Sequence, residues 1–340
     1  MAFVWFLLIL LCLLMYVSLD GYDLGIGIAT LFERDERQRR DMLEQVAQAW
    51  DGNETWLVLL AVALWAGFPQ AFGTILPHAY LPMIVVLLSL IVRGVSVEMV
   101  SQAPPARRWA KAFGMSSLVA ALAQGVLFGT LAMQLTVVDG AFSGTPFGAI
   151  GWFSVLAAAT VTVVYLALGY AFLKWKASGD LRARAGRRGT VFAVLASVLG
   201  VACLFAVNAT AAPLNLHSPG RAIGFSGLLL FAAAGVVMAL VTLRPTSPYD
   251  ALPTAGLVTA IVSLVIAVVV ARYPVLAPPA LTVDNTAAPT NTMVFLAVGI
   301  GLNVPLILFY NWFSHHTFRG KLDSRPEGRD LPTPGLRSHL

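Results

Sequence analysis

Two acidic pairs near the start of the chain are the residues best suited to chemistry. Asp20 and Asp23 lie within the first apolar run, and Asp51 and Glu54 stand at the beginning of the second. A spacing of three residues places both carboxylates of a pair on one face of a helix. Carboxylates at membrane depth cost about 2.5–3.5 kcal/mol each, so they usually face a protein interior and serve ions or protons. The sequence therefore predicts a buried acidic site beside the first two helices.

One arginine and one further acid accompany these pairs. Arg93 and Glu98 lie in the third apolar run, toward the same end as both acidic pairs, and we expect all six residues to converge at similar depth. An arginine offsets the desolvation of nearby carboxylates. A carboxyl group without a partner in a low-dielectric channel is suited to relaying protons. Two roles stay open for Arg93 and Glu98: a structural ion pair that ties helices together, or part of a proton route.

Tryptophan and glycine residues near the acids have two interpretations each. Trp50, Trp56 and Trp65 either line a cofactor site or anchor the membrane interface, and the second role is the commoner one. Gly21 and Gly25 either cradle a ligand or permit close helix packing, which we favour. The glycines are no dinucleotide fingerprint, because no strand precedes them.

Histidine is absent from every apolar run. The five histidines fall in predicted loops or the tail: His78, His217, His315, His316 and His339. A buried haem needs an axial histidine, methionine or cysteine, and the methionines in or near the spans are more simply core residues. Cys12 and Cys203 lie in apolar runs without a CxxC spacing, which is typical of small buried side chains. We therefore expect no haem, metal or other cofactor bound directly by this chain.

The composition identifies the elements that must position these residues. Of 340 residues, 58% are hydrophobic and only 11% charged, whereas soluble domains carry about 25% charged residues. The sequence pI near 9.4 does not indicate nucleic-acid binding, because the basic residues lie in short loops and form no stripe. No basic segment precedes the first apolar run and no A-x-A cleavage site follows it, so we interpret it as a spanning helix rather than a signal peptide.

Nine stretches approach or exceed the length of about twenty apolar residues that crosses a bilayer. They are residues 3–32, 54–73, 79–100, 114–136, 150–173, 190–211, 222–243, 252–271 and 292–313. The first is long and contains glycines, so we expect it to bend or end irregularly. The sequence predicts an all-α polytopic membrane protein with one transmembrane domain over residues 1–314. A disordered cytoplasmic tail over residues 315–340, rich in proline and charge, follows it.

The distribution of basic residues predicts the orientation. With an external N-terminus, 19 of the 22 lysine and arginine residues lie in internal loops or the tail, and only Arg221 and Arg272 lie in external loops. Positive charge favours the cytoplasmic side. We expect an external N-terminus and a cytoplasmic C-terminus.

Taken together, these segments resemble subunit II of cytochrome bd-type quinol oxidases, in particular the short members of the cyanide-insensitive branch. The resemblance spans nearly the whole chain, and its most specific part is the tryptophan-rich string that contains Asp51. The residues that carry it are segments 20–25, 39–43 and 50–57, Arg93 and Gly94 followed by Glu98, and the loop from Tyr273 and Pro274 through Pro278, Leu281 and Thr282 to Asp284.

The resemblance implies a partner and an activity. The partner is a haem-bearing subunit I with two b-type haems, one d-type haem (or a b-type haem in its place) and the quinol site. Together the subunits oxidise quinol, reduce dioxygen to water and take up protons from the cytoplasm, in the bacterial inner membrane. The spans are expected to form two four-helix bundles, spans 1–4 and 5–8, with the ninth peripheral. A single-helix accessory subunit, membrane lipids and a structural quinone are further candidate partners.

The resemblance also assigns roles to the acidic site. It places Asp51 on the proton-pathway aspartate of the family, with Asp20, Asp23 and Trp56 on the same route. Glu54 is an additional acid in this chain, which leaves the entry point open between two carboxylates. The alternatives are a secondary transporter with a membrane-buried acidic ion site, and a purely structural subunit.

Overall fold

The computed structural model describes residues 1–102, 106–132, 137–138, 141–142, 145, 147–210, 213–278, 281–317 and 320–321. The expectation of a disordered tail therefore falls almost entirely outside the described residues, except that residues 315–317 belong to the last helix.

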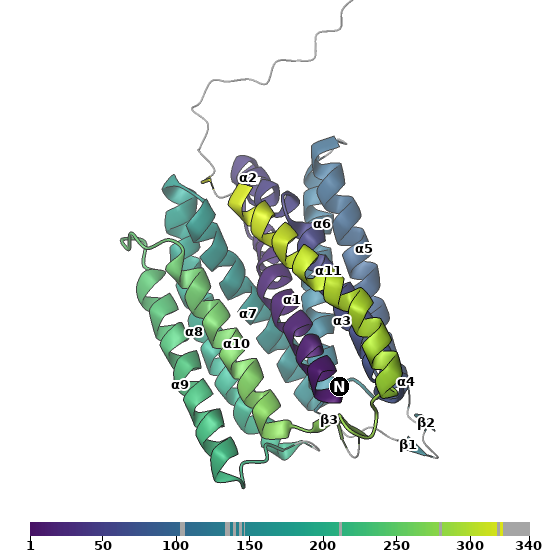
Figure 1. Ribbon diagram of the computed structural model, residues 1–340. Coiled ribbons are helices and arrows are strands. Elements are labelled where there is room, and N and C mark those ends of the chain that lie inside the picture. Colours follow the sequence, from purple (N-terminus) through teal and green to yellow (C-terminus); the bar gives the residue numbers. More distant parts are fainter. Residues whose placement is uncertain are drawn as a thin grey trace, which may run out of the picture.

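Long helices that run side by side make up nearly all of the described chain (Figure 1). The helices are α1 Ala2–Thr30, α2 Glu36–Ala47, α3 Trp50–Gly67, α4 Pro69–His78, α5 Tyr80–Gln102, α6 Ala106–Thr130, α7 Trp152–Lys176, α8 Gly179–Ala206, α9 Pro219–Thr242, α10 Leu252–Arg272 and α11 Thr290–Thr317. A short 3-10 turn, Val207–Ala209, follows α8. Two antiparallel strand pairs lie in loops: β1 Val137–Val138 with β2 Ala141–Phe142, and β3 Val275–Ala277 with β4 Leu281–Thr282. The predicted all-helical class is confirmed.

Eight helices within the described residues are long and apolar enough to cross a membrane: α1, α5, α6, α7, α8, α9, α10 and α11. The remaining predicted span, 54–73, is not one helix, because the chain breaks between α3 and α4. Phe68 has φ −135° and ψ 63°, and Pro69 follows it. Proline disfavours a helical conformation at the preceding residue and lacks the N–H that would continue the helix. The segment therefore contains a helix pair, of which α3 carries the acidic residues.

Other boundaries differ from the predicted spans at their charged ends. The helix predicted at 190 begins already at Gly179, and the helix predicted at 114 begins at Ala106. Hydropathy locates the apolar part of a span, whereas arginine and lysine are good helix formers that extend it. For the same reason α2 occupies a stretch expected to be a loop, with Asp35 as its N-cap accepting from the Arg37 N–H at 2.9 Å. The first helix is continuous to Thr30 and ends in a tightened turn, in which the N–H groups of Leu31 and Phe32 donate to the carbonyl oxygens of Ile28 and Ala29, both at 3.1 Å.

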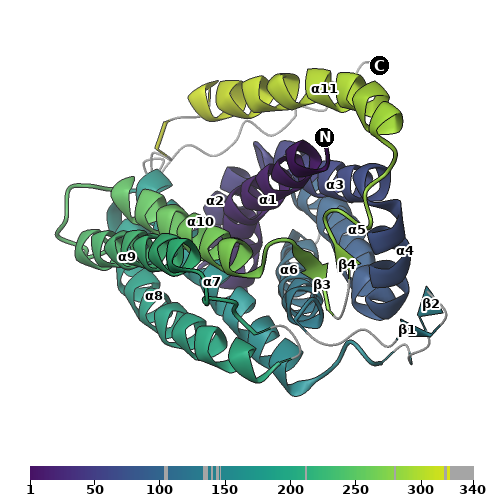
Figure 2. The same cartoon turned by 60° about the horizontal axis from the view of Figure 1, so that its bottom comes forward.

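Helix α1 lies at the centre of the molecule. It contacts α3, α6, α7, α10 and α11, which surround it in Figure 2. Every residue from Asp20 to Thr30 is buried. Helix α11 crosses obliquely over the outside of α1 and α3 (Figure 1). The acids of α1 are therefore placed deep inside the bundle.

Two glycines allow α1 and α7 to approach backbone to backbone. A Cβ on Gly25 would lie 1.8 Å from the Tyr165 carbonyl oxygen, and a Cβ on Gly169 would lie 2.5 Å from the Gly25 carbonyl carbon. Gly21 faces the same helix, since its Cβ would lie 2.9 Å from the Tyr165 ring. These contacts support the packing interpretation of the glycine motif.

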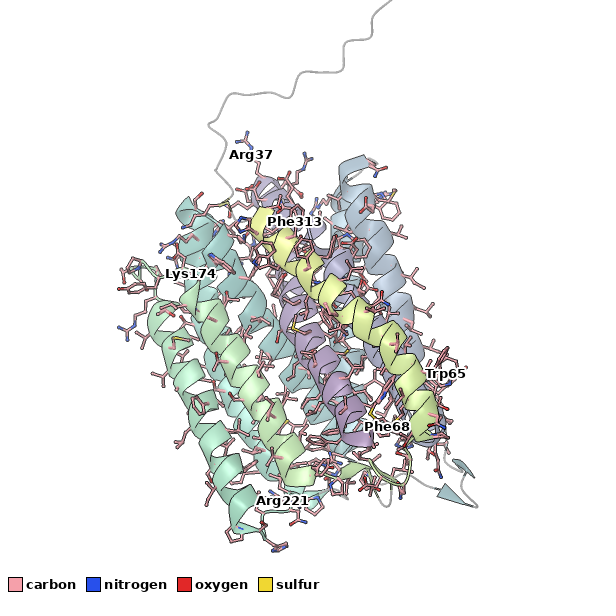
Figure 3. All side chains as sticks on the ribbon, in the orientation of Figure 1. Arg37, Trp65, Phe68, Lys174, Arg221 and Phe313 are labelled. Carbon is pink, nitrogen blue, oxygen red and sulfur yellow. The ribbon has the colours of Figure 1, made fainter. Side chains whose placement is uncertain are left out.

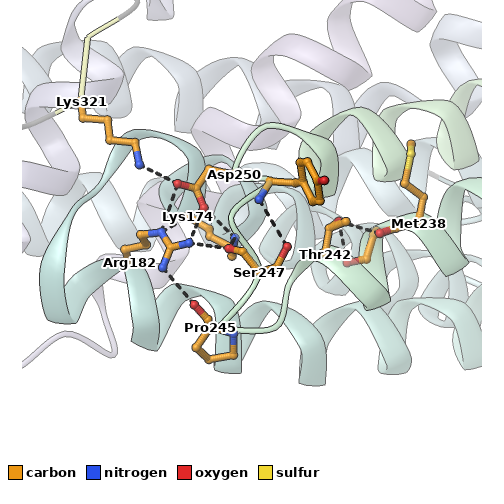
Figure 4. Close-up of polar contacts among 10 residues, drawn as sticks. Lys174, Arg182, Met238, Thr242, Pro245, Ser247, Asp250 and Lys321 are labelled. Atoms are coloured by element: carbon orange, nitrogen blue, oxygen red, sulfur yellow. Dashed lines mark hydrogen bonds and ion pairs between the residues drawn. The ribbon is translucent and has the colours of Figure 1, made fainter.

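A polar cluster around Asp250 joins the helices at the end where α2 lies and α8 begins, which we call the basic end (Figure 4). The Asp250 carboxylate accepts from Lys174 at 2.7 Å, from Arg182 at 2.9 Å and from Lys321 at 2.5 Å. Arg182 also donates to the Ser247 carbonyl at 2.6 Å. Burial alone would raise the pKa of Asp250, but the hydrogen bonds from these cations hold that pKa below its usual range. The cluster fixes the α9–α10 loop to α7 and α8.

We expect Gly25→Ala to destabilise the protein by about 1–3 kcal/mol or more, because the added methyl group overpacks a backbone contact. The melting temperature of the purified protein measures the effect. The matched control is Gly73→Ala in α4, where nothing lies within 4 Å of the added Cβ. Equal melting temperatures for the two variants would contradict the proposed packing.

The Asp250 cluster predicts a specific pH dependence. A carboxyl group with a depressed pKa stabilises the fold above its unfolded pKa of about 4, and that stability is lost as the pH falls toward the folded value. Asp250→Asn should lower the free energy of unfolding by about 1–3 kcal/mol at pH 7. The difference in stability between the variant and the wild type should become smaller below about pH 4. Melting curves at several pH values test this, with the exposed Asp284→Asn as a control that leaves stability unchanged.

Candidate functional site

A fully buried ion pair joins α1 to α5 at the centre of the site. The Arg93 guanidinium donates to both carboxylate oxygens of Asp20, with Nη1 at 3.0 Å from Oδ2 and Nη2 at 2.5 Å from Oδ1. Both side chains have no exposed surface. Such bidentate contacts are the strongest form of arginine–carboxylate pairing. This pair replaces the expected partnership of Arg93 with Glu98.

Glu98 lies on a different side of α5 from Arg93. The two residues are five positions apart, which is a rotation of about 140° around a helix, and Glu98 is exposed where Arg93 is buried. Helical periodicity therefore keeps Glu98 away from the acids of α1. In the structure the ion-pair partner of Arg93 is Asp20.

A second buried contact joins α1 to α3. The Asn53 side-chain amide donates to Asp23 Oδ2 and to the Tyr22 hydroxyl oxygen, both at 2.8 Å. Among the described residues no group donates a hydrogen bond to the other Asp23 oxygen, Oδ1. The Tyr22 ring stacks on Phe172 of α7 at a centroid distance of 4.1 Å. Asp23 thus keeps one carboxylate oxygen available.

A chain of hydroxyl and amide groups extends from Asp20 toward α6 and α7. Tyr16 lies one helical turn before Asp20 and within its electrostatic range, Gln124 donates to the Tyr16 oxygen at 2.7 Å, and the Tyr165 hydroxyl donates to the Gln124 carbonyl oxygen at 2.9 Å. All are buried. Sequence reasoning missed these three residues. Gln124 could have been noticed, because an amide side chain inside an apolar run is unusual, whereas the two tyrosines have no sequence feature that sets them apart.

The acids of α3 lie nearer the surface. Asp51 is exposed in the first turn of α3 and its Oδ1 accepts from the Gly52 N–H at 2.8 Å. Glu54 is partly buried and lies within the electrostatic range of Arg93, Asp20 and Asp51. In the described part of the chain, Glu54 Oε2 has no hydrogen-bond partner. The acids differ in burial: Asp51 is exposed, Glu54 is intermediate, and the two acids of α1 are buried.

Aromatic side chains close the site. Trp56 is fully buried, and its indole N–H meets no acceptor within the residues that the structure places. The Trp50 ring lies where a Cβ on Gly94 of α5 would meet it at 3.0 Å. Of these three tryptophans Trp65 is the one that points outward: it is 62% exposed, on the outer surface where Figure 3 labels it. The interface role therefore suits Trp65, whereas Trp50 and Trp56 pack inside.

The donor set of the site is acidic and contains one arginine. No group of three or more His, Cys, Asp or Glu residues in the described ranges is arranged to hold a metal. The interior instead combines one arginine with two carboxylates, Asp20 and Asp23, so Arg93 compensates one charge. Within the described residues, Arg93 pairs with Asp20, whereas Asp23 accepts a hydrogen bond from Asn53.

We expect Arg93→Gln to destabilise the protein by about 3–5 kcal/mol, because it leaves the Asp20 carboxylate buried and unpaired. Yield and melting temperature of the purified protein measure this loss. The control is Glu98→Gln on the same helix, where an exposed charge contributes at most about 1 kcal/mol. An Arg93→Gln variant as stable as that control would contradict the structural role of the pair.

Comparisons with known proteins agree with this architecture. Subunit 2 of the cytochrome bd-I ubiquinol oxidase of Escherichia coli (strain K12) is 26% identical, with 95% of each chain covered. Subunit 2 of the cytochrome bd ubiquinol oxidase of Bacillus subtilis (strain 168) is 32% identical over 220 residues, which span 59% of this chain and 62% of that relative.

A solved structure and a family model complete the comparison. The bd oxidase from Geobacillus thermodenitrificans matches with a TM-score of 0.75 at 16% identity, covering 93% of this chain and 98% of that chain, which shows a shared fold. A family model described as cytochrome bd terminal oxidase subunit II matches residues 1–318. The chain therefore belongs to the cytochrome bd terminal oxidase subunit II family.

Proposed function

We propose that this chain is the haem-free subunit of a membrane complex that oxidises quinol and reduces dioxygen to water. The family match over residues 1–318 carries this proposal. It is supported by the names of the Escherichia coli and Bacillus subtilis relatives, both subunits of ubiquinol oxidases. A haem-bearing subunit I is the partner, and this chain stabilises it. A structural quinone, lipids and a single-helix accessory subunit are further candidates for the complex.

The haems belong to the partner in this proposal. Haem iron in membrane proteins takes axial histidine, methionine or cysteine. The buried polar centre of this chain instead offers Asp20, Asp23, Arg93 and Asn53, which do not suit haem iron. We therefore assign the two b-type haems and the third haem, d-type or b-type, to subunit I.

In this proposal the membrane spans form two four-helix bundles and one peripheral helix. The second membrane span consists of α3 and α4 in succession, which brings the number of spans to nine. Contacts of α1 with α3 and α6, and of α5 with α6, support a first bundle of α1, α3–α4, α5 and α6. Contacts of α7 with α8 and α10, and of α9 with α10, support a second bundle of α7–α10. Helix α11 lies across the outside (Figure 1).

The basic end faces the cytoplasm in this proposal. Arg37 and Lys174 lie at this end in Figure 3, whereas Arg221 lies at the opposite end near the N-terminus. Positive charge favours the cytoplasmic side of a bacterial membrane. The N-terminus is then external and the C-terminus cytoplasmic, so the exposed Asp51 carboxylate opens toward the proton source.

We infer that the acids form a proton-uptake route into the membrane. The gradient of burial from exposed Asp51 through half-buried Glu54 to buried Asp23 supports this direction. Glu54 follows Asp51 by one helical turn, and each of Glu54 and Asp23 has a carboxylate oxygen that no described group bonds. Such an oxygen can accept a proton and release it to the next carboxylate, directly or through water. Trp56 seals the route with its buried ring.

Asp20 has a different part in this route. Its carboxylate is bound on both oxygens by Arg93, so it holds the guanidinium in place. Its negative charge and that of Asp51 both act on Glu54, opposed by Arg93. Asp20 is therefore a positioning residue, and Asp51, Glu54 and Asp23 are the groups that carry protons.

Asp51→Asn tests the route, because asparagine keeps the size and hydrogen-bonding shape of the side chain but cannot carry a proton. In the intact complex we expect quinol-driven oxygen consumption to fall at least about tenfold, an order typical for removing a positioned proton carrier. Haem content, measured by the reduced-minus-oxidised spectrum, should be unchanged. The exposed α2 acid Glu44 provides the matched control, and Glu44→Gln should respire normally.

Two results would contradict the proposal at different levels. Full oxygen consumption with intact proton uptake in Asp51→Asn would remove the proton role and leave a structural subunit. Purification of the wild-type chain without any haem-containing partner would instead remove the oxidase assignment and favour a secondary transporter.

A further inference from the structure

A cavity of about 480 Å³ opens at the basic end, away from the buried acids. It is lined by the end of α1, the loop that follows it, and one face each of α7 and α8: Phe32, Glu33, Arg34, Tyr170, Arg184, Arg188 and Phe192. This volume is within the range of about 300–1,000 Å³ that is usual for small-molecule sites. The proposed route for protons uses none of these side chains.

Positive charge predominates in this cavity. Three arginines, Arg34, Arg184 and Arg188, line it together with a single acid, Glu33. Glu33 Oε1 is occupied by the backbone N–H groups of Arg34 at 2.9 Å and Asp35 at 3.1 Å. The cavity therefore carries an excess of cationic groups over anionic ones.

Arg184 of α8 keeps donors available, and neither Arg184 nor Arg188 is held tightly by Glu33. Glu33 Oε2 lies 3.8 Å from Arg184 Nη2 and 3.9 Å from Arg188 Nη1, beyond the usual hydrogen-bond distance of about 2.7–3.2 Å. Arg184 Nε approaches the exposed Asp180 carboxylate at 3.3 Å. The nitrogens Nε and Nη2 of Arg184 are buried and make no hydrogen bond to any described group. Guanidinium groups with free N–H donors match the oxygens of a phosphate.

A buried hydroxyl group gives independent evidence of an absent ligand. Tyr170 is 3% exposed and lines the cavity. Arg188 interacts with its hydroxyl oxygen, but arginine can only donate, and no described group accepts a hydrogen bond from the Tyr170 O–H. The ring is fixed by stacking on Phe192, at a centroid distance of 5.5 Å and an interplanar angle of 9°. A buried polar group left without a partner is energetically costly. An acceptor oxygen supplied by a ligand would remove this cost.

The surroundings of the cavity select an amphipathic ligand. Arg184 and Arg188 are one turn apart on α8, and the same face continues as Val191, Leu195 and Val198, which are 58%, 45% and 61% exposed. The side chain of Phe32 at the rim is 55% exposed. A cationic cavity that continues into an exposed apolar stripe on a membrane helix matches a phosphate headgroup followed by an acyl chain.

We propose that this cavity binds the phosphate group of an anionic phospholipid. Arg184 and Arg188 bind the phosphate oxygens, Tyr170 donates a hydrogen bond to one of them, and the acyl chains follow the apolar face of α8. A lipid phosphate and a free phosphate ion present the same anionic oxygens to these side chains. The exposed apolar stripe of α8 favours the lipid, because a free ion would leave it uncovered.

The test uses the purified oxidase complex, stripped of lipid in detergent. It is titrated with dioctanoyl phosphatidylglycerol, with zwitterionic dioctanoyl phosphatidylcholine and with inorganic phosphate, and the shift in melting temperature is measured. We expect a saturable shift with phosphatidylglycerol at a concentration at least tenfold below that needed for either other probe. Native mass spectrometry should show one more retained phosphatidylglycerol in the wild type than in the double variant R184Q/R188Q.

Matched variants separate the cavity from general surface charge. R184Q/R188Q should need at least tenfold more phosphatidylglycerol for the same shift, whereas Arg187→Gln, on the exposed side of the same helix, should behave as the wild type. Tyr170→Phe keeps the ring and removes only the hydroxyl, so it should weaken phosphatidylglycerol binding several-fold. If R184Q/R188Q does not assemble, this variant alone tests the site. Equal losses in R187Q and R184Q/R188Q, or no loss in Tyr170→Phe, would overturn the site. Equal potency of inorganic phosphate would overturn the lipid assignment.

Discussion

The ion pair between Arg93 and Asp20 is the interaction on which the rest of this structure depends. Both groups are completely removed from solvent, and an isolated charge in such a place costs several kcal/mol. Neither residue is tolerable without the other, so α1 and α5 must meet at this depth. Because α1 is also the helix that contacts α3, α6, α7, α10 and α11, its position relative to Arg93 determines where the other helices pack.

The same pair divides the acids into two kinds. Asp20 is saturated by Arg93, whereas Asp23 and Glu54 each retain a carboxylate oxygen without a described hydrogen-bond donor. One arginine cannot neutralise three carboxylates, and the surplus is reduced when a proton is bound. In the proposed route, this difference in hydrogen bonding separates Asp20, the positioning carboxylate, from Asp23 and Glu54, the groups proposed to carry protons.

Sequence reasoning located the buried acids, because charges inside apolar runs have few alternatives to a protein interior. It failed where the answer depended on helix phase or on another helix. Counting positions would have separated Arg93 from Glu98, and Pro69 marked the break after α3. No pattern, however, could indicate that Asn53 bridges to Asp23 or that Tyr16, Gln124 and Tyr165 form a chain, since these contacts exist only after α1, α3, α6 and α7 have packed. The cavity beside Tyr170 was equally invisible for that reason.

The glycines and the acids of α1 lie on different sides of the same helix, so the position of α1 affects the contacts of both. Asp20 and Asp23 are about 60° apart around the helix and face α5 and α3, whereas Gly21 and Gly25 are about 40° apart and face α7. A Cβ on Gly25 would meet the α7 backbone at 1.8 Å, so a larger residue there moves α1 away from α7 and toward α5 and α3. That movement would act directly on a bidentate contact of 2.5 and 3.0 Å. The glycines therefore set the distance between α1 and α7, and through it the geometry in which Arg93 holds Asp20.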